Sequence, residues 1–261
     1  MRLVIAGAFM LMASGVGAQP TDSAATPPVV QDNSFLVEEA YNQEAGIVQH
    51  VSTFAAQRGS SDLAFTFAQE WPLFSIRHQL SFDLPVVRSG SSTGIGDIAL
   101  SYRYQLLGDG DAKIAIAPRI SMLIPTGDWK RRRGNGAIGG EAAIAASFIM
   151  SRLFAAHTNL GIAFTPRARN TSSAREDVHE YSLGQSIIFT GSRVIQPLVE
   201  AVYSDGSFGE EVVISPGARA ALNFSSGLQV VPGIAFPLGI GSSKGEKGVF
   251  VYLSFEHPFK R

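Results

Sequence analysis

The sequence predicts an all-β protein, a closed antiparallel up-and-down transmembrane β-barrel of about 12 strands. Three observations predict this fold class. Long segments alternate between apolar and polar residues, their connections alternate between short and long, and the chain begins with the pattern of an export signal. A barrel wall has lipid on one side and a polar lumen on the other, so a strand that crosses the membrane must alternate in this way.

The clearest alternation lies between Gly94 and Gly134. From Asp97 to Leu107 one parity is apolar or aromatic and the other is mostly polar or small: Ile98, Leu100, Tyr102, Tyr104 and Leu106 against Asp97, Ala99, Ser101, Arg103 and Gln105. A Gly-Asp-Gly-Asp turn at residues 108–111 predicts a hairpin, and the alternation then resumes as far as Ile124. Strands of roughly 11 residues exceed the globular mode of about 5 or 6 and suit the roughly 9 to 11 residues that cross a bilayer.

Composition agrees with this prediction and excludes some functions. The 261 residues contain no cysteine, 16% charged residues and a net charge of −1, which argues against a nucleic-acid partner. A hydrophobic content of 45% and a mean hydropathy of +0.14 would suit a soluble protein, but a barrel with a polar lumen looks the same. The 27 glycines and 13 prolines suit a chain with many turns.

The first 18 residues predict a cleaved signal peptide. Arg2 supplies a positive start, Leu3 to Val16 is apolar or small, and Val16-Gly17-Ala18 fits a cleavage site. An uncleaved anchor is the alternative, although the apolar run is short of the roughly 20 residues of a spanning helix. We therefore expect export to the outer membrane of a Gram-negative cell.

Residues 19–46 are expected to form a periplasmic lead-in segment before the barrel. Residues 19–33 are rich in Pro, Ser, Thr and Ala, which predicts a flexible stretch. Residues 34–46 place four apolar or aromatic side chains beside three acidic ones: Phe35, Leu36, Val37, Tyr41, Glu38, Glu39 and Glu44. The sequence leaves two alternatives open, a segment tucked into the barrel mouth and an ordered linker.

Residues 47–259 are expected to form the barrel itself. The predicted strands are 47–56, 63–71, 75–84, 97–107, 113–124, 138–150, 154–164, 181–190, 194–203, 212–224, 228–238 and 248–259. Connections after even-numbered strands are short, whereas those after odd-numbered strands from the third onward are long: 85–96, 125–136, 165–180, 204–211 and 239–247. Short periplasmic turns and long outer loops are typical of outer-membrane barrels, and this pattern puts both termini in the periplasm.

Four prolines lie inside the predicted strands, where a missing N–H normally disfavours a central position: Pro118, Pro197, Pro216 and Pro232. We expect local bulges to accommodate them.

Two motifs resemble a known family. GIGDIALSYRYQLL, with Gly94, Gly96 and Asp97, precedes an alternating strand that ends in LIPTGD, with Pro125 to Asp128. These motifs resemble the outer-membrane β-barrel transporters of the putative meta-pathway of phenol degradation family, and the resemblance runs from about Phe35 to the C-terminus. It implies passive uptake of small molecules, aromatic or hydrophobic ones among them. The closing YLSFEHPF resembles a last barrel strand recognised by the barrel-assembly machinery, although Lys260 and Arg261 follow its final aromatic residue.

The charged residues of the lumen-facing parity are the candidate functional residues of a channel: Glu70, Arg77, Asp83, Arg103, Arg119, Glu141, Glu200, Arg219 and Glu256. Mixed rings of charge could orient a polar solute or select ions. The alternative is a set of salt bridges and hydrogen bonds that holds the barrel together and partly fills it.

A basic run lies in a predicted outer loop, at Lys130, Arg131, Arg132 and Arg133. Arginine forks match phosphate geometry, so this run is a candidate site for lipopolysaccharide phosphates. A merely solvated loop is the alternative, and no wider basic surface suggests nucleic acid.

Signals of catalysis and of metal binding are weak. Residues 90–94 and 241–245 both fit G-x-S-x-G, but neither is followed by a predicted helix, and the histidines show no paired spacing. We expect neither cofactor nor metal. The predicted function is a passive outer-membrane channel for a small-molecule solute; the alternatives are a barrel enzyme acting on lipid or peptide, and a structural barrel with no open pore.

Overall fold

The computed structural model describes residues 33–109, 112–169, 171–192 and 194–259. The predicted signal peptide and residues 19–32 of the predicted lead-in lie outside these ranges. The strands are β1 Ile47–Gln57, β2 Leu63–Leu73, β3 Ser75–Ser89, β4 Ser92–Ile95, β5 Ile98–Tyr104, β6 Ile114–Ile124, β7 Gly139–Ile149, β8 Phe154–Arg169, β9 Arg175–Phe189, β10 Ile195–Gly206, β11 Glu211–Ala220, β12 Leu222–Asn223, β13 Gln229–Ala235, β14 Leu238–Gly239 and β15 Gly248–Pro258. Two 3-10 turns, η1 Trp129–Arg131 and η2 Gly241–Ser243, lie in connections.

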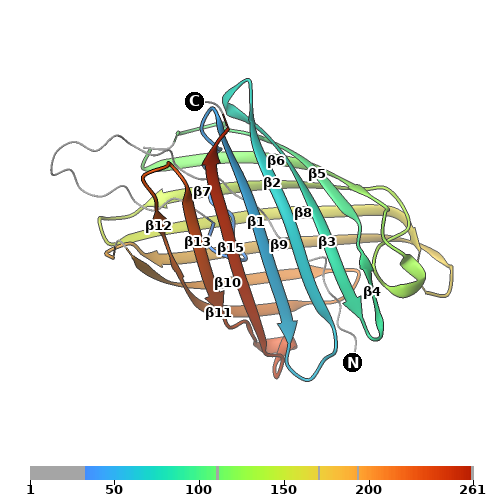
Figure 1. Ribbon diagram of the computed structural model, residues 1–261. Coiled ribbons are helices and arrows are strands. Elements are labelled where there is room, and N and C mark those ends of the chain that lie inside the picture. The colour runs from blue at the N-terminus through green and yellow to red at the C-terminus, as the bar shows by residue number, and fades with distance from the viewer. Residues whose placement is uncertain (1–32, 110–111, 170, 193, 260–261) are drawn as a thin grey trace.

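Twelve of these strands form one closed antiparallel barrel, which confirms the predicted fold class. Each strand pairs with its neighbours in chain order, β15 pairs with β1, and β11 pairs with β13 to close the ring. The short strands β4, β12 and β14 pair with β3, β13 and β11. Strands at the front of the barrel cross over those at the back (Figure 1), as expected when barrel strands tilt against the axis.

The two ends of the barrel differ. One end, here called the turn end, carries the beginning of β1, the end of β15 and mostly short connections such as the one at Phe74. The other end, the loop end, carries the longer connections and the extended tips of β3, β8 and β9. Within the described ranges no helix is long and apolar enough to cross a membrane.

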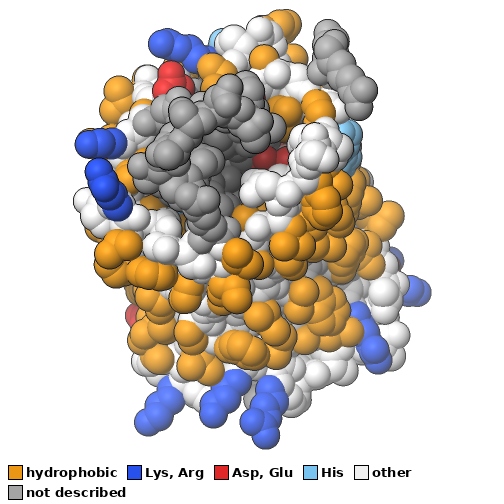
Figure 2. Space-filling view, turned by 60° about the vertical axis from the view of Figure 1, so that its left-hand side comes forward, with side chains coloured by type: hydrophobic (Ala, Val, Ile, Leu, Met, Phe, Trp, Pro, Cys, Tyr) orange, Lys and Arg blue, Asp and Glu red, His pale blue; other side chains and the backbone are white. Residues whose placement is uncertain are grey.

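The outer surface of the barrel is apolar. Large hydrophobic side chains of the outward parity are exposed along successive strands, among them Leu100, Ile120, Ile144, Leu160, Leu183 and Val199. Figure 2 shows hydrophobic side chains as a broad band over one face of the barrel, with Lys and Arg gathered at its margins. A soluble protein would bury such a band, so this surface fits a lipid environment.

Two predicted loops are largely strand. β3 continues to Ser89 and pairs with β4, and β8 and β9 pair as far as Arg169 and Arg175, so much of residues 85–96 and 165–180 is sheet. The regular apolar–polar alternation does not continue through these extensions, whereas the hydrogen bonding between the strands does. The predicted ends of β3 and β8 were therefore too early, and the predicted start of β9 was too late.

The expected bulges do not occur at the four strand prolines. Pairing passes through Pro118, Pro197, Pro216 and Pro232 without a register shift. Register shifts occur instead at Pro72/Leu73 in β2 and between Thr165 and Ala168 in β8, where Pro166 lies and Arg167 has φ 54°.

Candidate functional site

Residues 33–46, here called the inner segment, run through the interior of the barrel. From Asn33 to Gln43 every side chain except Leu36 is buried. Of the two alternatives for residues 34–46, the structure shows a segment within the barrel. Because the segment forms no regular secondary structure, its backbone groups need hydrogen-bond partners from the lumen wall.

Glu200 on β10 binds the start of the inner segment. Its Oε1 accepts the backbone N–H groups of Phe35, Leu36 and Val37 at 2.8, 2.7 and 3.0 Å. Three consecutive amides thus converge on one carboxylate oxygen, which is the arrangement of a backbone anion site. Here the protein supplies the anion itself.

Side-chain amides and a hydroxyl bind the middle of the inner segment. The Asn159 side chain accepts the N–H of Glu38 at 2.6 Å and donates to its carbonyl at 3.0 Å. It therefore satisfies both backbone groups of Glu38, as the backbone of a neighbouring strand would. The Ser147 hydroxyl accepts the N–H of Ala40 at 2.7 Å and contacts His157 Nδ1, also at 2.7 Å.

Two glutamines bind the end of the inner segment. Gln105 Oε1 accepts the N–H of Asn42 at 2.8 Å, and its Nε2 donates to the carbonyl of Ala40 at 2.5 Å. Gln79 Oε1 accepts the N–H of Gln43 at 2.8 Å. Over its whole length the segment has partners from Gln79 on β3 to Glu200 on β10, which lie on opposite sides of the ring, so the segment is tied to opposite parts of the wall.

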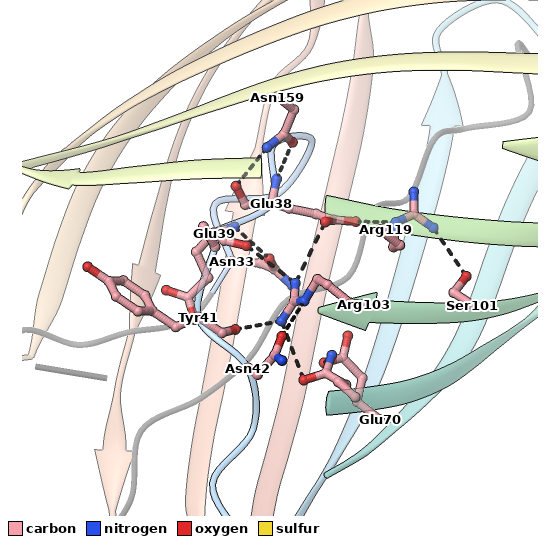
Figure 3. Close-up of polar contacts among 12 residues, drawn as sticks. Asn33, Glu38, Glu39, Tyr41, Asn42, Glu70, Ser101, Arg103, Arg119 and Asn159 are labelled. Carbon is pink, nitrogen blue, oxygen red and sulfur yellow. Dashed lines mark hydrogen bonds and ion pairs between the residues drawn. The ribbon is translucent and has the colours of Figure 1, made fainter. Parts of the chain in front are cut away.

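Two arginines surround Glu38, as Figure 3 shows. Arg103 donates to Asn42 Oδ1 at 2.8 Å and to the Tyr41 carbonyl at 2.5 Å, and its Nη1 lies 3.7 Å from the Glu38 carboxylate. Arg119 Nε lies 3.3 Å from the same carboxylate. Breaking a buried pair leaves an uncompensated charge, so Glu38 couples the position of the segment to the charge balance of the lumen.

Arg119 also connects Glu38 to the wall. Its Nη2 lies 3.5 Å from Glu141, and its Nη1 donates to the hydroxyls of Ser121 and Ser101 at 2.7 and 3.2 Å. This guanidinium therefore lies between a carboxylate of the segment and one of the wall.

Phe35 occupies an apolar part of the lumen. Its ring lies 5.9 and 5.5 Å from the rings of Phe250 and Tyr252. A Cβ atom added to Gly217 would lie 2.8 Å from Phe35 Cε2, and one added to Gly233 would collide with the ring. The wall has no side chain at these two glycines, and the Phe35 ring occupies the space that a side chain would need.

The structure brings most of the predicted lumen residues together inside the barrel. Six are buried: Glu70, Arg103, Arg119, Glu200, Arg219 and Glu256. Glu141 and Asp83 are partly buried. Arg77 is exposed, because it lies at the turn end, one inward position beyond Gln79.

Sequence reasoning missed the uncharged residues that bind the inner segment. Gln79, Gln105, Ser147 and Asn159 all have the lumen-facing parity, so alternation places them correctly. Only charged members of that parity were chosen as candidates, and nothing in the local pattern distinguishes an amide that binds backbone from one that binds water.

The basic run divides into two parts. Arg133 is largely buried: its Nη1 donates to Ser92 Oγ at 2.9 Å, and its Nη2 lies 3.7 Å from Asp128. Lys130, Arg131 and Arg132 are exposed, and Arg131 Nε lies 3.4 Å from Asp128. Three cations therefore face solvent at the loop end, and the fourth is a structural residue.

The two family-like motifs meet in this loop. Asp97 accepts the N–H groups of Gly127 and Asn135 at 2.9 and 2.7 Å, and Thr126 donates to the Gly96 carbonyl at 2.7 Å. Burial raises the pKa of Asp97, and these two backbone donors oppose the shift. The motifs thus fasten the connection after β6 to the start of β5, which is a structural role.

An outwardly apolar, closed barrel with a polar interior defines an outer-membrane β-barrel protein. A family model described as "Putative MetA-pathway of phenol degradation" matches residues 25–255, and the chain belongs to this family, as the motifs predicted.

Solved structures of bacterial porins and channels share the fold. The outer membrane channel from Pseudomonas putida F1 has a TM-score of 0.59 at 13% identity, covering 84% of this chain and 97% of that one. The NanC porin has a TM-score of 0.57 at 7% identity, and the KdgM porin 0.54 at 10%; each covers 79% of this chain and 98% of that one. No curated protein sequence matches the chain.

Proposed function

We propose that this protein is an outer-membrane channel for passive passage of small molecules through the lumen, with the inner segment restricting the path. One observation carries the proposal. Inward positions of the wall include many small residues, among them Ala68, Ala117, Ala145, Gly184 and Gly217, and a separate stretch of chain fills the space they leave. A barrel of twelve strands is wider than the eight-stranded barrels that side chains alone can fill.

The inner segment is bound by contacts that water can replace. Most of the contacts described above are hydrogen bonds to wall side chains, and each contributes about 0.5–1.5 kcal/mol net because water competes for the same groups. Partial displacement toward the turn end therefore costs far less than opening the sheet. Passage would proceed by diffusion past the displaced or narrowed segment.

Single-channel recording in planar bilayers tests this function. The full chain with Glu200→Ala and Asn159→Ala loses acceptors for four segment amides, and we expect a larger or more frequent conductance than in the unaltered protein. Ser215→Ala is the control, because Ser215 lies opposite Glu200 in the sheet and its buried hydroxyl has no hydrogen-bond partner among the described residues. A folded double variant without current would support a structural barrel and overturn the channel proposal.

The family description and the titles of the similar structures suggest the solute class. They refer to phenol degradation, to porins and to an outer membrane channel. We propose small aromatic or hydrophobic compounds as candidate solutes. Uptake into liposomes that hold the folded protein, compared for phenolic, fatty and sugar solutes, would separate these classes; equal rates for all three would contradict a preference.

A barrel enzyme remains the second candidate because Ser147 and His157 are in hydrogen-bond contact. Both are buried, and the Ser147 hydroxyl accepts the N–H of Ala40, so the pair serves the inner segment in this structure. Loss of an ester- or peptide-hydrolysing activity in Ser147→Ala would favour catalysis. An altered conductance with no such activity would favour the channel.

Partners in the membrane follow from the loop end and from β15. We propose that Lys130, Arg131 and Arg132 bind lipopolysaccharide phosphates, with Arg133 holding the loop. Replacing the three by Gln should lower the amount of lipopolysaccharide that copurifies, whereas Arg88→Gln, an exposed cation on β3, should not. We also expect the barrel-assembly machinery to bind the end of β15, which is followed by Phe259, an aromatic residue exposed at the turn end.

A further inference from the structure

One row of directly paired residues runs around the inner wall and carries four carboxylates. Glu256 pairs with Gln49, and Gln49 pairs with Glu70. Three serines, Ser81, Ser101 and Ser121, continue the row from Glu70 to Glu141. Ala163 then links Glu141 to Glu180. Residues directly opposite each other in a sheet share a face, so the whole row faces the lumen.

This carboxylate row also runs along the barrel. Barrel strands tilt by about 35–45° from the axis, so a row that crosses them at right angles climbs from one end toward the other. Glu256 is two residues from the end of β15 at the turn end, whereas Glu180 is in the outer part of β9, toward the loop end. The row therefore follows a helical path along the lumen.

At the loop end the row approaches an acidic pocket. A cavity of about 170 Å³ is lined there by Asp62, Glu211 and Glu246 together with Lys247 and small apolar residues. The carboxyl group of Glu180 interacts electrostatically with those of Glu211 and Glu141. Carboxylates thus follow one another from the pocket to the interior.

The charge balance of the lumen is negative. Five carboxylates and three guanidinium groups of the described residues are fully buried, and Asp83 and Glu141 add two partly buried carboxylates. Each buried arginine also contacts the inner segment: Arg103 at the Tyr41 carbonyl, Arg119 at Glu38, and Arg219 at the Asn33 carbonyl. All three arginines are therefore engaged by the segment, and Arg119 also lies 3.5 Å from Glu141 in the row. Among the described residues, the carboxylates still outnumber the guanidinium groups.

We propose that the carboxylate row makes this lumen selective for cations, so that inorganic cations and protonated amines pass in preference to anions of similar size. The inference rests on the proposed channel function. Fixed charges along a narrow path of low dielectric raise the local concentration of counter-ions and repel ions of like charge.

The test is the reversal potential of the folded full chain in a planar bilayer under a KCl gradient, repeated in Gly233→Ala, which loosens the inner segment. We expect K⁺ to permeate severalfold better than Cl⁻. Glu141→Gln with Glu180→Gln should lower that ratio severalfold; if this pair fails to fold, Glu180→Gln alone should still lower it. The control is Asp205→Asn, which removes the same charge from an exposed outward position beside this row.

The outcomes separate the two proposals. Current carried equally by both ions, or mainly by Cl⁻, would overturn the selectivity while leaving the channel intact. A ratio that falls as much in Asp205→Asn as in the glutamate variants would show surface charge to be the cause and would overturn the role of the row. No current in either the unaltered protein or Gly233→Ala would overturn both proposals.

Discussion

At the scale of single residues, the packing of the inner segment depends on glycines of the wall as much as on the side chains that contact it. Gly217 and Gly233 face the lumen where the ring of Phe35 meets the wall, and Gly184 does so where a Cβ would lie 3.0 Å from Val37 Cγ2. A methyl group at these positions needs the space that the segment now fills. The inner segment and the glycine positions of the wall therefore have complementary shapes, as the two sides of a packed core do.

Gly233→Ala should loosen the inner segment without damaging the barrel. The new methyl group overlaps the ring of Phe35, and overpacking typically costs about 1–3 kcal/mol, which the weakly bound segment can relieve by moving. We expect a higher mean conductance in planar bilayers. Gly140→Ala is the matched control, because its Cβ points outward and would contact only the Ser121 carbonyl oxygen at 3.6 Å. Equal conductance in both variants would mean that Phe35 does not restrict the path.

An outward side chain in the middle of a strand tests the facing of the barrel. Ile144 is the central residue of β7 and is exposed on the apolar surface. Arg at this position should destabilise the folded barrel by about 2–4 kcal/mol if it lies at the bilayer midplane. Urea titration of protein folded into vesicles measures the change, with Ile144→Ala as the apolar control. Equal costs for Arg and Ala would contradict a lipid-facing position.

At the scale of elements, the loop after β6 is organised by hydrogen bonds to one buried carboxylate. Asp97→Ala removes two charged hydrogen bonds, each worth about 1.5 kcal/mol or more, so the loop should open more often. Trypsin cleavage at Lys130 to Arg133 should become at least about tenfold faster. Asp62→Ala, which frees the N–H of Gly90 in a different connection, should leave this cleavage unchanged. Unaltered cleavage in Asp97→Ala would show that other contacts hold the loop.

Alternation predicted the strands better than the connections. It placed β6 and β7 within a residue or so, because outward Ile120 and Ile144 meet lipid while inward Arg119 and Ala145 meet the lumen. It ended β8 too early and began β9 too late, because the apolar–polar alternation does not continue into the paired tips of these strands. The motif residues Asp97 and Thr126 were identified from the sequence, but their structural role depends on a contact between two connections.

The position of the inner segment was not predictable from its own residues. Phe35, Val37 and Tyr41 indicate that part of it is buried, yet the same pattern fits a linker. Its partners, such as Gln105, Asn159 and Glu200, come from strands whose mutual register depends on pairing around the whole ring. Alternation fixes which face a residue occupies, and it does not fix which residues lie opposite each other on neighbouring strands. The carboxylate row was hidden for the same reason.

At the scale of the whole molecule, the acidic pocket at the loop end should make ion selectivity depend on pH. Glu211 begins β11, and burial together with the nearby Glu246 raises the pKa of its carboxyl above the usual value. Asp62 and Lys247 line the same pocket, and Glu180 lies within range of its charge. A raised pKa means that Glu211 takes up its proton earlier than an ordinary glutamate as pH falls, so the mouth loses negative charge before exposed carboxylates do.

The preference for K⁺ over Cl⁻ should therefore weaken as pH falls below 7, before ordinary exposed carboxylates titrate near a pKa of about 4.3. In Glu211→Gln the ratio at neutral pH should already be lower, and the part of the pH dependence that Glu211 causes should disappear, because the neutral amide cannot take up a proton. Glu210→Gln is the matched control, since Glu210 is the exposed neighbour just outside the strand. Reversal potentials at a series of pH values measure both effects. A ratio that is constant from neutral pH down to the ordinary carboxylate range would show that the charge at the mouth does not control which ions enter, and selectivity would then have to be set deeper in the lumen, at Glu141 or Glu70.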